Sequence, residues 1–149
     1  MTIQFKHVLV PIDFGEPSGV ALEAAIDLAR RFDAQLTLVH VYDIPTYVYS
    51  GITYPTGELL GQLQKAARDS FDKELRRVHA ELPTAKGVLR CGPAAQEILA
   101  TIDEVHPDLV VIGTHGRKGV KHALLGSVAE KVVRSSPVPV LTMHGREAP

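Results

Sequence analysis

Five strand-like segments alternate along this chain with four segments of helical periodicity, and no hairpin signal joins two strands directly. A helix between two strands carries the chain back to its starting edge, so consecutive strands run parallel. Residues 35–42 are nearly continuous in apolar character, as in a strand buried on both faces. We therefore predict an α/β fold, a doubly wound five-stranded parallel sheet with helices on both faces. The predicted strands are residues 8–12, 35–42, 84–91, 108–112 and 137–143.

Apolar residues recur every three or four positions between these strands, which predicts amphipathic helices over 21–32, 60–82, 93–105 and from Ser127 onward. The mixed polarity of residues 84–91 is typical of an edge strand. Residues 43–56 contain two prolines and three tyrosines and are predicted to form a long loop. Loops of this length are often functional or mobile. A lid over a ligand, a contact with a partner and ordinary loop packing all stay open for it.

Length and charge limit the classes of function. A chain of 149 residues fits one domain, which we expect to cover residues 1–149. A net charge of −1 gives no overall attraction to nucleic acid or to an anionic membrane. Cys91 is the only cysteine, and the first residues show no signal segment, so we expect a cytoplasmic protein. No apolar run approaches the roughly 18 residues that suggest a membrane span.

Glycines mark both ends of the segment that follows the fourth predicted strand. Gly113 and Gly116 follow the strand, where the missing Cβ permits positive φ or a close approach to the main chain. Gly126 precedes the helix that begins near Ser127, where backbone N–H groups lack intrahelical acceptors and the helix dipole is positive. This arrangement suits an anion such as phosphate. Arg117 in the intervening loop can add positive charge.

Simpler interpretations exist for the same residues. Ser127 and Glu130 have the spacing of a capping box, in which both side chains satisfy helix N–H groups and no ligand is required. Asp13, at the end of the first strand, can simply hold a turn or cap the first helix. His115 can contact phosphate or face solvent. The seven histidines show neither metal-ligand spacing nor neighbouring cysteines, so we predict no metal site, and no nucleophile motif indicates catalysis.

The spacing Gly113-x-x-Gly116, nine residues, Gly126-Ser127 resembles the nucleotide-binding signature of the universal stress protein family. Residues 8–13 and 137–141 resemble the first and last strands of that family. The resemblance implies the strand order 3-2-1-4-5 and a binding site for ATP together with Mg²⁺. The residues that it assigns to the nucleotide are Pro11, Asp13, Val41, Ile112, Gly113, Gly116, Arg117, Gly126, Ser127 and Val128.

The resemblance also implies a homodimer. The last strand is apolar, and an exposed apolar edge is usually covered or paired. Pairing is expected through Val138, Val140 and Leu141, although Pro139 removes one hydrogen-bond donor. Two functions follow: an ATP-binding regulatory protein of the stress response, without a dedicated enzymatic activity, or a homodimeric adaptor of the same fold that is independent of nucleotide. Neither function involves nucleic acid or a membrane span, and the downstream protein partner is not specified.

Overall fold

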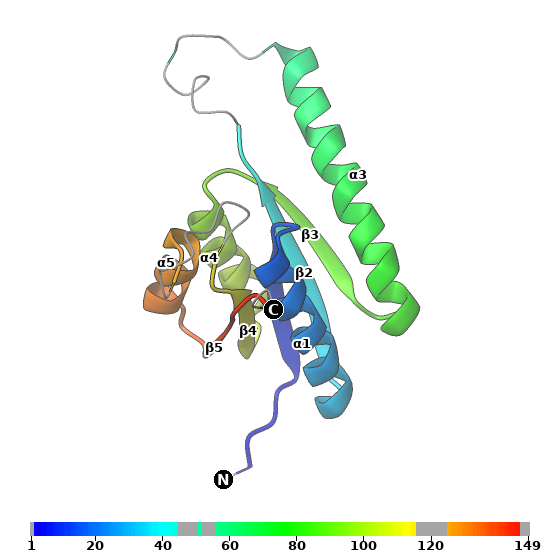
Figure 1. Ribbon diagram of the computed structural model, residues 1–149, viewed down its shortest axis with the longest axis vertical. Coiled ribbons are helices and arrows are strands. Elements are labelled where there is room, and N and C mark those ends of the chain that lie inside the picture. The colour runs from blue at the N-terminus through cyan, green and yellow to red at the C-terminus, as the bar shows by residue number, and fades with distance from the viewer. Residues whose placement is uncertain (1, 45–50, 52–55, 116–124, 147–149) are drawn as a thin grey trace.

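The computed structural model describes residues 2–44, 51, 56–115 and 125–146. Its strands form one parallel sheet in the order β3-β2-β1-β4-β5 (Figure 1). Both the fold class and the strand order agree with the prediction. The elements are β1 His7–Ile12, α1 Glu16–Phe32, β2 Gln35–Tyr42, α3 Gly57–Glu81, β3 Lys86–Cys91, α4 Ala94–Val105, β4 Leu109–Gly113, α5 Ser127–Ser135 and β5 Val140–Met143.

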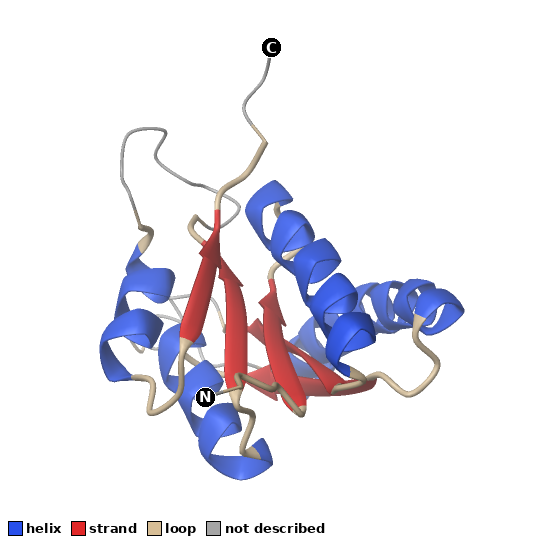
Figure 2. Ribbon diagram, turned by 90° about the horizontal axis from the view of Figure 1, so that it is seen from below, coloured by secondary structure: helices blue, strands red, loops and turns tan. Residues whose placement is uncertain are grey.

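Helices cover both faces of the sheet (Figure 2). On β1, Val8, Val10 and Ile12 pack in the cluster that contains buried residues of α1 and α3. Leu9, between them, packs in the cluster that contains buried residues of α4 and α5. Alternate residues of a strand point to opposite faces, so Pro11, like Leu9, points toward α4 and α5. The apolar pattern of the strands therefore sorts their side chains between two cores.

β1 and β4 are neighbours, and their following helices lie on opposite faces of the sheet. At the amino end of this pair, the Asp108 carboxylate accepts hydrogen bonds from the N–H groups of Lys6 (2.7 Å) and His7 (3.1 Å). Burial lowers the pKa of His7, so its imidazole is neutral near pH 7. Because the helices that follow β1 and β4 lie on opposite faces, a crevice opens at the carboxyl ends of these two strands, where α/β proteins bind ligands.

The predicted start of the first helix, residue 21, is wrong, because α1 begins at Glu16 with Pro17 tolerated in its first turn. Among the strands, the predicted boundaries differ most at the two edges. β5 begins at Val140, three residues later than predicted, because Pro137 and Pro139 have no N–H to donate to a ladder. The carbonyl of Pro139 nevertheless accepts a hydrogen bond from Val110 (3.0 Å). Within the described residues, no helix is both long enough and apolar enough to cross a membrane.

Gly113 ends β4 against the first turn of α1. A Cβ at this position would lie 2.6 Å from the carbonyl carbon of Pro17 and 2.7 Å from the nitrogen of Ser18, which are backbone atoms. Positive φ is not the reason for glycine here, because the positive-φ glycines of the described residues are Gly51 and Gly92. Close approach, the second possibility drawn from the sequence, explains Gly113, and the approaching group is a helix backbone of the same chain.

We expect Gly113→Ala to lower the free energy of unfolding by about 1–3 kcal/mol, because the added methyl group forces β4 and α1 apart. Gly61→Ala is the control. Gly61 lies within α3, and a Cβ there meets no atom within 4 Å. Alanine at this helical position should raise stability by about 0.5–1 kcal/mol. Urea denaturation followed by circular dichroism measures both, and equal stabilities of the two variants would contradict the close-contact explanation.

Candidate functional site

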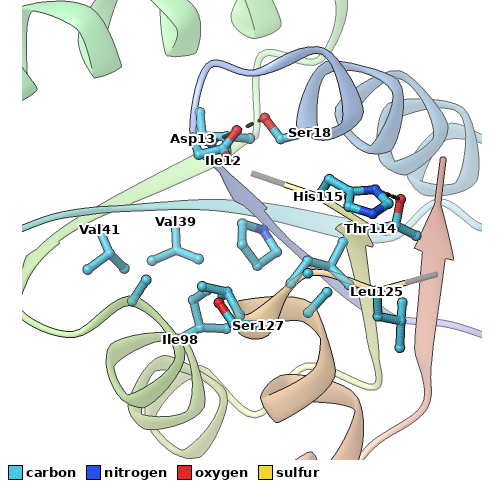
Figure 3. Close-up of a pocket in the computed structure, with 17 residues that line it drawn as sticks. Ile12, Asp13, Ser18, Val39, Val41, Ile98, Thr114, His115, Leu125 and Ser127 are labelled. Atoms are coloured by element: carbon cyan, nitrogen blue, oxygen red, sulfur yellow. Dashed lines mark hydrogen bonds between the residues drawn. The ribbon is translucent and has the colours of Figure 1, made fainter. Parts of the chain in front are cut away.

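A cavity of about 480 Å³ opens at the carboxyl ends of the strands, on the face covered by α4 and α5. This volume falls in the range of small-molecule sites. Figure 3 shows Val39, Val41 and Ile98 toward one end of the cavity and Thr114, His115 and Leu125 toward the other. The remaining lining residues are Pro11, Ile12, Asp13, Ser18, Ala94, Ile112, Gly113, Gly126, Ser127, Val128 and Ala129.

The first end of the cavity is apolar. Val39 and Val41 project from β2 on the α4 side of the sheet, and both pack with the cluster that contains Ile98 of α4. Ala94, in the first turn of α4, also lines this end. Flat apolar rings bind in such surroundings, and the backbone at the end of β2 can supply polar contacts at their edge.

The amino end of α5 forms a second wall. Gly126 is the N-cap, with φ −71° and ψ 167°, and its N–H donates to the carbonyl of Thr114. Ser127, Val128 and Ala129 are the first three helical residues and line the cavity, so N–H groups without intrahelical acceptors lie at its wall. The positive end of the helix dipole adds to their attraction for an anion.

The capping-box interpretation of Ser127 is wrong. The helix is capped by Gly126, and no side-chain hydrogen bond caps it. Ser127 therefore occupies the first helical position, and its hydroxyl is not required to satisfy the helix. The Glu130 carboxylate instead accepts a hydrogen bond from Arg134 one turn later (2.8 Å).

Asp13 lies in a tight turn between β1 and α1. Its Oδ1 accepts a hydrogen bond from the N–H of Gly15 (2.8 Å), and its own N–H donates to Ser18 Oγ (3.1 Å). The next residue, Phe14, has φ of +66°, a left-handed conformation that costs roughly 1–2 kcal/mol for a residue with a Cβ. The turn interpretation of Asp13 is thus confirmed. A carboxylate has a second oxygen, so holding the turn leaves capacity for a ligand.

Thr114 links two histidines at the other end of the cavity. Its buried hydroxyl lies 3.1 Å from His115 Nδ1 and 3.4 Å from His144 Nδ1, and a hydroxyl can donate one hydrogen bond and accept another. His115 lines the cavity, which favours the ligand contact over plain solvent exposure, the two possibilities drawn from the sequence. The sequence around His115 did not distinguish a ligand contact from solvent exposure.

The structure brings together the predicted residues that it describes. Those that line the one cavity are Pro11, Asp13, Val41, Ile112, Gly113, Gly126, Ser127 and Val128. Gly116 and Arg117 lie outside the described residues. Sequence reasoning missed Val39, Ile98 and Thr114. Val39 could have been found, because it lies two positions before Val41 and so shares its face of the strand. No feature of the sequence indicated that Ile98 of α4 lies beside these two valines.

The model of the universal stress protein family matches residues 4–144. Universal stress protein YxiE of Bacillus subtilis is 33% identical over 94% of this chain and 99% of the relative. A universal stress protein of Methanocaldococcus jannaschii is 31% identical over 93% of this chain and 82% of the relative.

Solved structures share the fold. One is a universal stress protein in complex with cAMP, with a TM-score of 0.72, 22% identity, and coverage of 97% of this chain and 100% of the other. Another, from Arabidopsis thaliana with AMP bound, has a TM-score of 0.66, 16% identity, and coverage of 95% and 92%. The family match across nearly the whole sequence and these similarities lead to one conclusion: the chain belongs to the universal stress protein family.

Proposed function

We propose that this protein, as one domain over residues 1–149, binds ATP in the cavity between β1 and β4 and acts in the stress response as a regulatory protein. The observation that carries the proposal is the joining of two chemically different ends in one cavity of about 480 Å³, an apolar end and a helix N-terminus. A nucleotide has the same division, with a flat base at one end and an anionic phosphate chain at the other.

The fit runs along the cavity. The adenine lies at the apolar end between Val41 and Pro11, and the main chain around Val41 contacts its polar edge. The ribose lies beside Asp13, whose carboxylate accepts a hydrogen bond from a sugar hydroxyl. The phosphates lie at the start of α5, and the residues proposed to hold them are Gly113, Gly116, Arg117, Gly126, Ser127 and Val128, with Ile112 beside them.

Magnesium accompanies ATP in this proposal and is held chiefly by the phosphate oxygens and water, as Mg²⁺ is in most nucleotide sites. The lining residues agree with a small contribution from the protein to Mg²⁺ binding, because Asp13 is the one carboxylate among the described lining residues. No cluster of three or more His, Cys, Asp or Glu side chains suited to a metal ion occurs in the described part of the chain. The ion therefore arrives with the nucleotide.

The related structures support adenine as the base, since one contains cAMP and another AMP. The helix N-terminus supports a phosphate group on the ligand. The proposed role is regulatory: nucleotide occupancy orders the loops around the cavity and changes a surface that a partner protein recognises. The proposal does not include a dedicated enzymatic activity, and it locates the protein in the cytoplasm.

Ser127→Pro tests the phosphate contact. Proline is tolerated at the first position of a helix, and Gly126 already has the extended backbone that a residue before proline requires. The variant therefore removes one N–H and one hydroxyl while it preserves α5. We expect ATP to bind about 10- to 100-fold more weakly by calorimetry, because charge-assisted hydrogen bonds contribute about 1.5–3 kcal/mol each.

Ser127→Ala is the matched control, since it removes only the hydroxyl and should cause a smaller loss. Unchanged ATP affinity in Ser127→Pro, with circular dichroism showing an intact fold, would exclude the start of α5 as the phosphate site. Failure of the wild-type protein to bind ATP with or without Mg²⁺ would favour the alternative function, a homodimeric adaptor that is independent of nucleotide.

We further propose a homodimer through the β5 edge of the sheet. Among the described residues, β5 pairs only with β4, so no described strand of the same chain lies along its outer edge. Leu141 of β5 is 40% exposed. Val138 and Val140, also assigned to this interface, are half-buried against the cluster beneath α4 and α5.

Leu141→Glu should convert the dimer to a monomer, because two buried carboxylates would face each other across the interface. Leu141 is preferable to Val140 for this test, since Val140 also supports the core. Light scattering after size-exclusion chromatography should give twice the chain mass of 16.2 kDa for the wild-type protein and the chain mass for the variant. Gln64→Glu, an exposed change on α3, should leave the dimer intact. A dimeric Leu141→Glu variant would refute this interface.

A further inference from the structure

His40 lies on the side of the sheet opposite the cavity. It is a residue of β2 directly across from Ile12 of β1 in the parallel register, and its side chain is 9% exposed. Its neighbours Val39 and Val41 line the cavity, so His40 projects toward α1 and α3. In the row of alternate residues it follows Leu36 and Leu38, which are fully buried apolar side chains. His40 therefore occupies a buried position in a row that is otherwise apolar, which calls for an explanation.

The ring of His40 contacts the two residues that flank Asp13. Its Nδ1 lies 2.8 Å from the carbonyl oxygen of Ile12, which can only accept, so this nitrogen carries the hydrogen. The ring centroid lies 4.5 Å from that of Phe14 and 6.3 Å from that of Phe71 in α3. Ile12, Asp13 and Phe14 are consecutive, and His40 therefore holds the residue before the carboxylate and the residue after it.

Phe14 explains why such support is needed. Its φ of +66° reverses the chain at once after β1, so that the Asp13 carboxylate borders the cavity while the phenyl ring lies over His40. Residues with a Cβ leave this conformation unless neighbouring contacts hold them in it. The hydrogen bonds of Asp13 join it to Gly15 and to Ser18 in the first turn of α1. Contact with His40 joins the turn to β2, in addition to the backbone contact between Gly113 of β4 and the first turn of α1.

We propose that His40 is a positioning residue for the nucleotide site, acting from behind the sheet through the Ile12 carbonyl and the Phe14 ring to hold the Asp13 carboxylate toward the ligand. This inference rests on the proposed nucleotide function. It assigns His40 no contact with the ligand. The effect of changing His40 must therefore pass through Asp13, which makes the proposal testable by a double-mutant cycle.

The cycle compares His40→Leu, Asp13→Asn and the double variant, titrated with AMP by calorimetry. Asp13→Asn keeps the Oδ1 acceptor for Gly15 and should weaken binding about tenfold, the effect of one hydrogen bond to a charged group. His40→Leu, which removes the donor and the aromatic ring, should weaken binding about threefold or more. The double variant should bind within about twofold of Asp13→Asn alone. Unchanged affinity in His40→Leu, or losses that multiply in the double variant, would overturn the proposal.

Leu38→Ala is the control for general loss of packing. Leu38 is fully buried two residues before His40 on the same face, so this variant destabilises the same core without touching the turn. Its affinity for AMP, measured well below the unfolding temperature, should equal that of the wild-type protein. An equal loss in Leu38→Ala and His40→Leu would show that His40 acts only through stability and would overturn the positioning role.

A readout without ligand separates this inference from the proposed function. The amide of Gly15 donates to Asp13 Oδ1, so its hydrogen exchange reports whether the turn is formed. We expect exchange at Gly15 to be about tenfold faster in His40→Leu than in Leu38→Ala. If the wild-type protein binds no AMP but this difference is found, the nucleotide function fails and the support of the turn by His40 stands. Equal exchange rates would exclude that support even if AMP binds.

Discussion

β1 and β4 pair side by side at the centre of the sheet, and the helices that follow them lie on opposite faces. This reversal keeps helices from closing over the carboxyl ends of the two strands, and the cavity lies there. Gly113 then brings β4 within backbone contact of the first turn of α1. The same residue that a nucleotide-binding motif would assign to a ligand is thus required for the packing of the fold. At this position, binding and stability cannot be separated by mutation.

The turn after β1 is a second place where folding and binding share residues. Asp13 holds the turn with its carboxylate and its N–H, and Phe14 adopts a left-handed conformation beside it. The aromatic contact with His40 offsets part of the free-energy cost of the left-handed conformation of Phe14. Support for the cavity therefore comes from both faces of the sheet, from α4 and α5 in front and from the His40 ring behind.

Periodicity in the sequence predicted the order of the strands and helices that the described residues form, because a buried strand and an amphipathic helix differ in apolar repeat. The strand order came from the family resemblance, and local sequence could not supply it. Residues at strand ends, such as Asp13 and Gly113, were found because parallel strands gather their ends at one edge. Contacts between distant segments were not accessible: Phe14 carries none of the usual signals of a left-handed residue, and His40 resembles an ordinary member of an apolar strand.

The central claim is that an adenine nucleotide occupies the cavity with its phosphate at the start of α5 and its base near the end of β2. The most direct measurement is a titration of the isotopically labelled protein with AMP, followed through its backbone amide resonances. The account predicts saturable shifts at Val41 and at Gly126, Ser127 and Val128, with little change at the far end of α3. No shifts at saturating concentrations, or shifts confined to residues remote from the cavity, would contradict it.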